Sequence, residues 1–235
     1  MIAIINPDTP VPVIDGLIAN GFTPVTIPLC LQVHRPIAGH PDIQLCIVNN
    51  TIIYQPAIDS SFLQVLSHTK YQLVRGQTTL LSSYPYDCAY NCAHTGKVAF
   101  HNTKVTDNSI KQALKICSDP LIHVNQGYTK CSTCIVDTDA IITSDISIHN
   151  AALRNSIDSL LIQPGYIELP GYNYGFIGGA SGKCSDTVYF TGHVNHHPDA
   201  MQIKHFIEQH NKKIAFLSDL CAIDIGSIFF IDMNT

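Results

Sequence analysis

The sequence predicts an α/β protein made of five similar units arranged in a ring, each with the order strand, strand, helix, strand. The first observation behind this fold class is a motif that occurs three times, at Ile43–Tyr54, Tyr90–Phe100 and Ser132–Ile142. In each copy a cysteine precedes two mostly apolar residues, a polar turn and a second apolar or β-branched run. The copies recur at intervals of about 40–50 residues, a period typical of closed, propeller-like arrays.

The second observation is that the two ends of the chain carry incomplete units that complement each other. The N-terminal part predicts a strand at Ile2–Ile5, a helix at Val11–Asn20 and a strand at Thr23–Leu29. The C-terminal part, Ala222–Ile231, predicts one strand with no helix after it. We therefore expect the two termini to join and complete the fifth unit within a single domain, residues 1–235. Closing the ring would leave no exposed central edge strand.

The first complete unit begins with a hairpin, Ile43–Val48 and Thr51–Gln55, whose turn is Asn49-Asn50. Apolar residues on one face predict a helix at Ala57–His68, and Tyr71–Val74 follows as the third strand. The next three units are predicted in the same order. The second comprises Cys88–Ala93, Val98–His101, a helix near Asn108–Ile116, and Leu121–Val124; the third comprises the strand pair from Cys131 through Ile142, a helix near Ser147–Asn155, and Ser159–Ile162; the fourth comprises Tyr174–Gly178, Thr187–Thr191, a helix at Pro198–His210, and Lys213–Leu217.

Composition narrows the class of protein. With 46% hydrophobic and 13% charged residues, the chain of 235 residues is expected to be compact and globular. A net charge of −5 argues against a nucleic-acid groove, which needs clustered basic residues. No apolar stretch reaches the roughly 18–20 residues of a membrane span, and the N-terminus has no basic region typical of a signal peptide. Nine cysteines in such a chain are expected to stay reduced, which favours the cytoplasm.

Several segments carry a resemblance to a known fold. Asp87-Cys88-Ala89, continued by Val98–Phe100, is similar to the second unit of the dimethylarginine hydrolases. Those enzymes, the arginine deiminases and the amidinotransferases share the pentein fold, an α/β propeller of five pseudo-repeated strand–strand–helix–strand units. The whole chain resembles more closely a bacterial domain-of-unknown-function family with this guanidine-modifying-enzyme fold. That resemblance is carried by NQGYTKCS (Asn125–Ser132), GYIELPGYNYGFIGGASG (Gly165–Gly182) and DIGSI (Asp224–Ile228).

The resemblance implies a cysteine nucleophile, a histidine proton carrier and carboxylates that hold a guanidinium. Asp87 matches one of these carboxylates, whereas Tyr86 replaces its acidic neighbour. The histidine is expected on the first strand of the fourth unit, but Tyr174–Gly179 contains none. The nucleophile is expected near Asp224, where the nearest cysteine is Cys221, several residues too early. The sequence therefore predicts that the usual Cys/His pair is missing.

An axial pocket is still expected to bind a small molecule. Asp87, Asn91 and Asp224, with Lys130 opposite them, predict an acidic, hydrogen-bonding site for a polar or cationic ligand. Asp87 and Lys130 also have ordinary interpretations, as a turn residue and a solvated surface charge. The glycine-rich segment adds Gly178, Gly179 and Ser181, whose backbone could form a nest for a carboxylate. It lacks the spacing of a phosphate-binding loop.

Metal sites are weaker alternatives. Two cysteine pairs, Cys88 with Cys92 and Cys131 with Cys134, have the number of ligands that a zinc site needs. On strands, residues three apart point to opposite faces, which disfavours such a site. Cys46, Cys92 and Cys134 occupy matching repeat positions, and this is expected of core packing, although the face they occupy stays open. A second cluster consists of His193, His196, His197 and Asp199; Pro198 at a helix start explains it without a metal.

The sequence thus favours a pentein-type protein without the hydrolytic pair that binds a small polar or cationic ligand at its axis. One alternative is a guanidino-group hydrolase acting on C–N bonds with Cys221 as a displaced nucleophile. The other is a zinc-binding protein that uses Cys88, Cys92, Cys131 and Cys134. No cofactor, nucleic acid or membrane partner is expected, and a homo-oligomer remains open.

Overall fold

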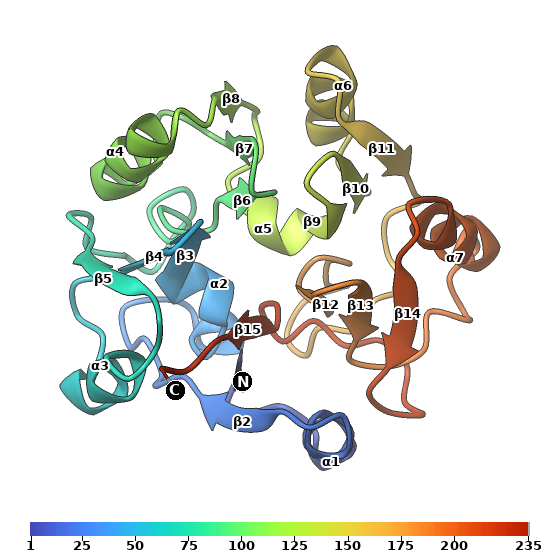
Figure 1. Ribbon diagram of the computed structural model, residues 1–235, viewed down its shortest axis with the longest axis horizontal. Coiled ribbons are helices and arrows are strands. Elements are labelled where there is room, and N and C mark those ends of the chain that lie inside the picture. Colours follow the sequence, from blue (N-terminus) through green and yellow to red (C-terminus); the bar gives the residue numbers. More distant parts are fainter. Residues whose placement is uncertain (235) are drawn as a thin grey trace.

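Five three-stranded sheets surround a common centre in the computed structural model, which describes residues 1–234 (Figure 1). In each sheet the first two strands of a unit are antiparallel, and the third lies parallel to the middle one. The sheets are β3–β4–β5 (Leu45–Val48, Thr51–Tyr54, Gln72–Arg75), β6–β7–β8 (Ala93–His94, Ala99–His101, Leu121–His123), β9–β10–β11 (Thr133–Asp137, Ala140–Thr143, Asp158–Leu161), β12–β13–β14 (Ser181–Cys184, Thr187–Phe190, Lys213–Phe216) and β15–β1–β2 (Phe229–Ile231, Ile2–Ile5, Thr23–Thr26).

One longer helix connects the middle strand of each unit to its third strand and lies on the outside (Figure 1). These helices are α1 (Val11–Ala19), α3 (Ser60–Leu66), α4 (Asn108–Cys117), α6 (Ile146–Arg154) and α7 (Ala200–Gln209). Asp59, Asp107 and Asp145 cap the starts of α3, α4 and α6 by accepting a backbone N–H two residues on. Such caps satisfy donors that the first helical turn leaves free, so the sequence fixes these helix starts locally.

The fifth sheet contains both ends of the chain. The N-terminal strand β1 pairs antiparallel with the C-terminal strand β15 and parallel with β2; Ile4, for example, lies opposite Phe229. This is the arrangement predicted from the two incomplete units. It means that the last unit forms only when the two termini meet.

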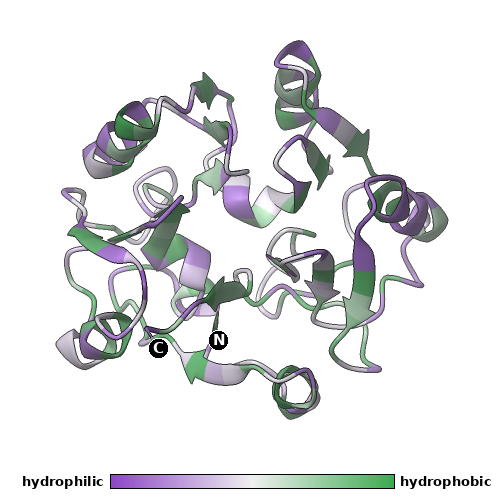
Figure 2. Ribbon diagram, viewed as in Figure 1, coloured by the Kyte–Doolittle hydropathy of each residue, from purple (hydrophilic) through white to green (hydrophobic). Residues whose placement is uncertain are grey.

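The core lies between the sheets and the outer helices. The middle strand of each unit contributes large buried side chains to it, among them Ile4, Ile52, Phe100, Ile141 and Phe190. Figure 2 shows green segments on strands of the sheets and a mixture of purple and green on the outer helices. Burial of apolar surface is the main favourable term in folding, and here it is divided among five similar units.

The repeated cysteines belong to this core. Cys46 lies on β3 and Cys134 on β9, and Cys92 directly precedes β6; all three are buried. The Sγ atom of Cys46 donates to the carbonyl of Cys92 at 3.9 Å, and both pack in one apolar cluster. Core packing, as predicted, accounts for the repetition of these residues.

Three sequence predictions about strands are wrong. The first strand of the fourth unit is β12, Ser181–Cys184, and the predicted Tyr174–Gly178 is irregular. Close backbone contacts explain this, because a side chain on Gly178 would collide with the carbonyl oxygens of Lys130 and Thr133. Cys131 was placed on a strand but lies in the short helix α5 (Thr129–Ser132), and the strand expected from Cys88 shrinks to β6.

Short helices precede two of the first strands: α2 (Pro41–Gln44) leads into β3, and α5 leads into β9. A 3-10 turn, η1 (Arg35–Ile37), lies before α2. Within residues 1–234, none of the helices has the length and apolar character needed to cross a bilayer. The segments before the first strands are important because they meet at the centre of the molecule.

Candidate functional site

Each of the five units sends one segment to the centre, just before its first strand. These segments contribute buried polar groups to one hydrogen-bonded cluster, here called the axial cluster. Its members, from the first to the fifth unit, are His40 and Asp42; Asn91; Lys130 and Cys131; Gly178; and Asp224 and Ser227.

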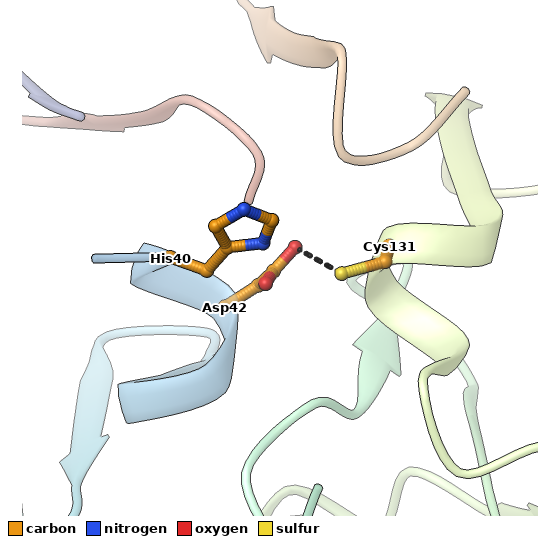
Figure 3. A group of neighbouring side chains, drawn as sticks. All are labelled: His40, Asp42 and Cys131. Atoms are coloured by element: carbon orange, nitrogen blue, oxygen red, sulfur yellow. Dashed lines mark hydrogen bonds between the residues drawn. The ribbon is translucent and has the colours of Figure 1, made fainter. Parts of the chain in front are cut away.

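Asp42 holds the cluster together. Its Oδ2 atom accepts hydrogen bonds from the Sγ of Cys131 at 3.0 Å and from the Oγ of Ser227 at 2.7 Å. Lys130 in turn donates from Nζ to the Oγ of Ser227 at 2.8 Å. Figure 3 shows Asp42 on α2 between the ring of His40 and the thiol of Cys131 on α5. The other oxygen of Asp42, Oδ1, is buried and has no hydrogen-bond partner.

Asn91 fixes the position of the Cys131 thiol. Its Oδ1 accepts the backbone N–H groups of Lys130 and Cys131 at 2.8 and 3.1 Å, and its Nδ2 donates to the Sγ of Cys131 at 3.2 Å. All of these groups are buried, so each bond avoids a desolvated polar atom without a partner. The thiol is therefore oriented from both sides, by an amide and by a carboxylate.

His40 is the least satisfied member of the cluster. Its side chain is 1% exposed, and neither ring nitrogen has a hydrogen-bond partner. Its Nδ1 lies 3.8 Å from the Oδ1 of Asp224. Burial lowers the pKa of His40, and the nearby Asp42 offsets this only partly. A neutral imidazole with free nitrogens beside a thiol is suited to accept and return a proton.

Asp224 is held by the backbone. Its Oδ2 accepts the N–H of Phe176 and its Oδ1 the N–H of Gly226, each at 2.9 Å. Burial raises the pKa of Asp224 to about 6, although both backbone bonds and Lys130 favour the ionised form. Gly179 gives the carboxylate its space, because a side chain there would collide with it.

Burial also controls the charge of Asp42 and Cys131. It raises the pKa of Asp42, and the pKa of Cys131 lies well above its usual value because of burial and the two carboxylates. The thiol is therefore protonated in this arrangement. A positive charge placed next to the cluster would favour the carboxylate and thiolate forms, since opposite charge lowers the pKa of an acid.

A cavity of about 330 Å³ reaches the axial cluster from the loop side of the sheets. We call it the loop-end pocket. Its polar floor contains His40, Cys131 and Asp224. The walls are mostly aromatic or apolar and consist of Ile37, Tyr128, Leu169, Tyr172, Asn173, Tyr174 and Phe176. A pocket of this kind, apolar with a few convergent polar groups, is typical of small-molecule sites.

Among the ligand-binding residues predicted from the sequence, Asn91, Lys130 and Asp224 meet in the axial cluster. Asp87 does not line the loop-end pocket but contacts a residue that does. Its Oδ2 accepts a hydrogen bond from the hydroxyl of Tyr128 at 2.6 Å, and Tyr128 lines the pocket. Burial raises the pKa of Asp87. The other oxygen of Asp87 is buried without a partner.

The glycine-rich segment serves packing more than ligand binding. Its carbonyl at Gly178 accepts from the Oγ of Ser227 at 3.0 Å, and the N–H of Gly179 donates to the carbonyl of Cys131 at 2.9 Å. The N–H of Ser181 donates to the carbonyl of Gly178. Because these amides already have partners, they are not free to form the predicted carboxylate nest.

Cys221 lies outside the axial cluster. It is partly exposed, forms an isolated bridge with His193, and does not line the loop-end pocket. The structure therefore gives the displaced nucleophile no contact with the groups that would activate it.

The predicted four-cysteine zinc site is not formed either. Cys88 donates to the carbonyl of Pro85, whereas Cys131 donates to Asp42, and Cys134 is packed in the core. In the histidine cluster, His197 uses both ring nitrogens in bonds to the backbone of Gln163 and Asp199. These residues have structural roles that need no metal.

Within residues 1–234, one group of side chains has ligand atoms close enough for a metal ion. It consists of His40, Asp42 and Cys131, whose ligand atoms all lie within 4.8 Å of one another. Nitrogen, oxygen and thiolate sulfur suit a borderline divalent ion such as zinc, and the adjoining pocket would leave a coordination position open.

Sequence reasoning missed His40, Asp42 and Ser227. It considered Cys131 only as a zinc ligand and not as part of the axial site. A signal was present in the repeat: Asp42 and Cys131 each lie shortly before the repeated cysteine of their unit, Cys46 and Cys134. Superposing the units would have placed both at the inner end of a first strand.

Comparison with known proteins agrees with this architecture. The model of a family of unknown function, DUF6873, matches residues 4–229. The chain belongs to this family. No curated protein matches its sequence significantly.

Three of the solved structures that are similar to this chain are named as guanidine-modifying enzymes. An amidinotransferase of saxitoxin biosynthesis from Microseira wollei superposes with a TM-score of 0.59 at 10% identity, covering 100% of this chain and 94% of that one. Agmatine deiminase from C. jejuni superposes with a TM-score of 0.50 at 8% identity, covering 79% of this chain and 69% of that one. A putative peptidyl-arginine deiminase superposes with a TM-score of 0.50 at 11% identity, covering 92% of this chain and 79% of that one. These likenesses show that this member of DUF6873 has the α/β pentein fold.

Proposed function

We propose that this DUF6873 protein binds a small guanidino or amidino cation in the loop-end pocket and cleaves one of its C–N bonds with Cys131 as nucleophile. The observation that carries the proposal is the meeting of Cys131, His40, Asp42 and Asp224 in one buried site. The proposal replaces both the expectation that a Cys/His pair is missing and the candidate Cys221.

The charges of the site favour a cation. Asp42 and Asp224 are both buried, and desolvation raises the pKa of each. A planar cation with several N–H donors, bound beside Asp224 in the pocket, would compensate the negative charge of these carboxylates. Tyr172, Tyr174 and Phe176 on the walls offer aromatic faces to the same cation.

The cation would also activate the nucleophile. Its positive charge lowers the pKa of the Cys131 thiol, and neutral His40 accepts the proton. The thiolate attacks the central carbon of the amidino group, and the C–N bond to the leaving nitrogen breaks as His40 returns the proton to it. Water then adds to the carbon, the S–C bond breaks, and the thiol is restored while the product leaves with an oxygen in place of the amine.

Turnover assays test this proposal. Agmatine, arginine and methylguanidine are incubated with the protein, and released amine and ureido product are measured. We expect turnover of at least one compound, loss of about a thousandfold or more in Cys131→Ser, and little change in Cys221→Ser. Equal loss in both variants, or full activity of Cys131→Ser, would contradict the proposed nucleophile.

A second candidate is zinc-assisted hydrolysis, favoured by the spacing of His40, Asp42 and Cys131. In that case water bound to the metal would be the nucleophile and the thiolate a ligand. Metal analysis of the purified protein separates the two. Stoichiometric zinc that His40→Asn removes would favour the metal, whereas activity that survives dialysis against a chelator would favour the thiol.

We further propose that the five units form one closed ring within a single domain, residues 1–235. We also propose that the protein resides in a bacterial cytoplasm. Support comes from the sheet shared by the two termini and from the cysteines, which are free thiols.

A further inference from the structure

A second cavity, of about 350 Å³, lies at the opposite end of the first strands from the loop-end pocket. We call it the strand-end cavity. Its lining includes Ile47 of β3, His94 of β6, Lys183 of β12 and Phe230 of β15, whereas the loop-end pocket is lined by residues before these strands. The two cavities therefore open at the two ends of the same axis.

The strand-end cavity has a basic lining. Its lysines and histidine are Lys130, Lys183 and His94, and the residues that line it include no aspartate or glutamate. The lining also contains polar side chains, but the hydroxyls of Thr95 and Ser181 already donate to the carbonyls of Thr138 and Gly178, and the Asn49 amide donates to Asp119. This lining contrasts with the carboxylates in the loop-end pocket.

Lys130 is the central cation of this cavity. Lys130 is only 9% exposed, and its Nζ donates a hydrogen bond to the uncharged Oγ of Ser227 at 2.8 Å. The same nitrogen lies 5.7 Å from the centre of the Phe229 ring, which also lines the cavity. In the part of the chain that the structure describes, no ion pair within 4.0 Å includes Lys130. The carboxylates of Asp42 and Asp224 interact with this ammonium without direct contact. A buried ammonium with no carboxylate in direct contact is stabilised further by an anion that binds it.

Lys183 adds positive charge at the mouth of the cavity. Its Nζ lies 3.2 Å from the Oδ1 of Asp137, but the other oxygen of Asp137 is bound by Lys212 at 2.6 Å. One carboxylate thus serves two lysines and neutralises only one of them. His94 contributes less charge, because burial lowers its pKa despite its contact with Asp119.

We propose that the strand-end cavity binds a small oxyanion, a carboxylate or a phosphate, with Lys130 and Lys183 as its cationic contacts. The second N–H of the Asn49 amide, whose first N–H donates to Asp119, can donate to a remaining oxygen of the anion. Charge-assisted hydrogen bonds of this kind are the strong ones in a partly buried site.

This anion site is distinct from the proposed cation site but connected to it. Lys130 donates to Ser227, Ser227 donates to Asp42, and Asp42 accepts from Cys131, so one chain of hydrogen bonds joins the two cavities. An anion that draws the ammonium of Lys130 toward the strand end weakens its bond to Ser227. The anion site does not depend on chemistry in the loop-end pocket, because different residues line the two cavities.

Isothermal titration of the whole protein with inorganic phosphate and, separately, with succinate tests the inference. Sodium chloride at equal ionic strength serves as the control. We expect saturable binding of at least one probe, and the probe that binds tells a phosphate site from a carboxylate site. The Kd should rise at least tenfold in Lys183→Met and in Lys130→Met, whereas Lys70→Met, at an exposed lysine, should leave it unchanged.

Two results would overturn the anion site: binding of neither probe beyond chloride, or wild-type affinity in Lys183→Met. Lys183 is partly exposed, so its variant decides the matter even where Lys130→Met fails to fold. Cys131→Ser should retain anion binding while losing turnover. Failure of the anion site and failure of the proposed function are thus separate outcomes.

Discussion

The Sγ atom of Cys131 lies 3.0 Å from the Oδ2 of Asp42, although 89 positions separate the two residues in the chain. Asp42 comes from the first unit and Cys131 from the third, and Ser227 of the fifth unit donates to the same oxygen. One carboxylate therefore joins three of the five units at their centre. The proposed reaction of the Cys131 thiol depends on this contact.

The Cys131 thiol is expected to react slowly in the folded protein. It is 4% exposed, and burial with two carboxylates raises its pKa well above the usual value, so little reactive thiolate is present. Iodoacetamide at pH 7.5, followed by mass spectrometry, should modify exposed Cys117 and leave Cys131 intact. Unfolding in urea should remove the difference. Equal rates at both residues in the folded protein would contradict the described environment.

Binding of a guanidinium cation is expected to tighten as pH rises from about 5 to about 7. The pKa of Asp224 is raised from 3.8 to about 6, so its carboxylate becomes available to a cation only over this range. The free protein shows the opposite trend: the stability that protonated Asp224 contributes is present below pH 3.8 and is lost as pH rises through about 6.

Thermal-shift measurements with methylguanidine at both pH values check this dependence. Asp224→Asn should remove most of it, because an amide does not ionise. The interpretation is wrong if wild-type protein binds equally well at both pH values.

Asn91→Ala is expected to destabilise the fold by about 1–3 kcal/mol, because it removes the acceptor of two buried N–H groups and the donor to Cys131. Urea unfolding measures the change. Asn108→Ala is the matched control, since Asn108 is exposed at the start of α4, and its effect should stay within about 0.5 kcal/mol. Similar losses in both variants would mean that Asn91 does not organise the centre.

Ile4→Ala is expected to cost about 2–5 kcal/mol, because Ile4 is fully buried in the middle strand of the sheet that joins the termini. Ile18→Ala on α1, where the side chain is 58% exposed, should change the free energy of unfolding by less than about 0.5 kcal/mol. Urea unfolding followed by circular dichroism distinguishes the two. A small effect of Ile4→Ala would argue against a sheet that depends on both ends.

Local patterns predicted most of the fold. Two apolar or β-branched runs on either side of the Asn49-Asn50 turn identified β3 and β4, and a helical apolar stripe identified α3. These signals act between near neighbours, so a sequence displays them directly. The Tyr174–Gly178 prediction failed because an apolar run can pack as irregular backbone where glycines allow other segments to approach closely.

The axial cluster was only partly visible. Asn91, Lys130 and Asp224 were selected because they are polar residues within or close to predicted strands or the resembling segments, but His40 and Asp42 lie in what reads as a proline-containing loop. Cys131 was considered as a zinc ligand, since its spacing from Cys134 suggested a pair. Its true neighbour, Asp42, lies at a similar place before Cys46, but this position alone does not show that the two side chains meet.

The sequence by itself indicated the repeated units and most of their elements, because apolar runs, helical stripes and turns are properties of short segments. Only the tertiary structure decided which polar groups meet. His40, Asp42, Cys131 and Asp224 come from three units, and their contact depends on how five sheets are placed around one centre. The pKa values of the acid and thiol groups there depend on the same packing, since desolvation is their first cause.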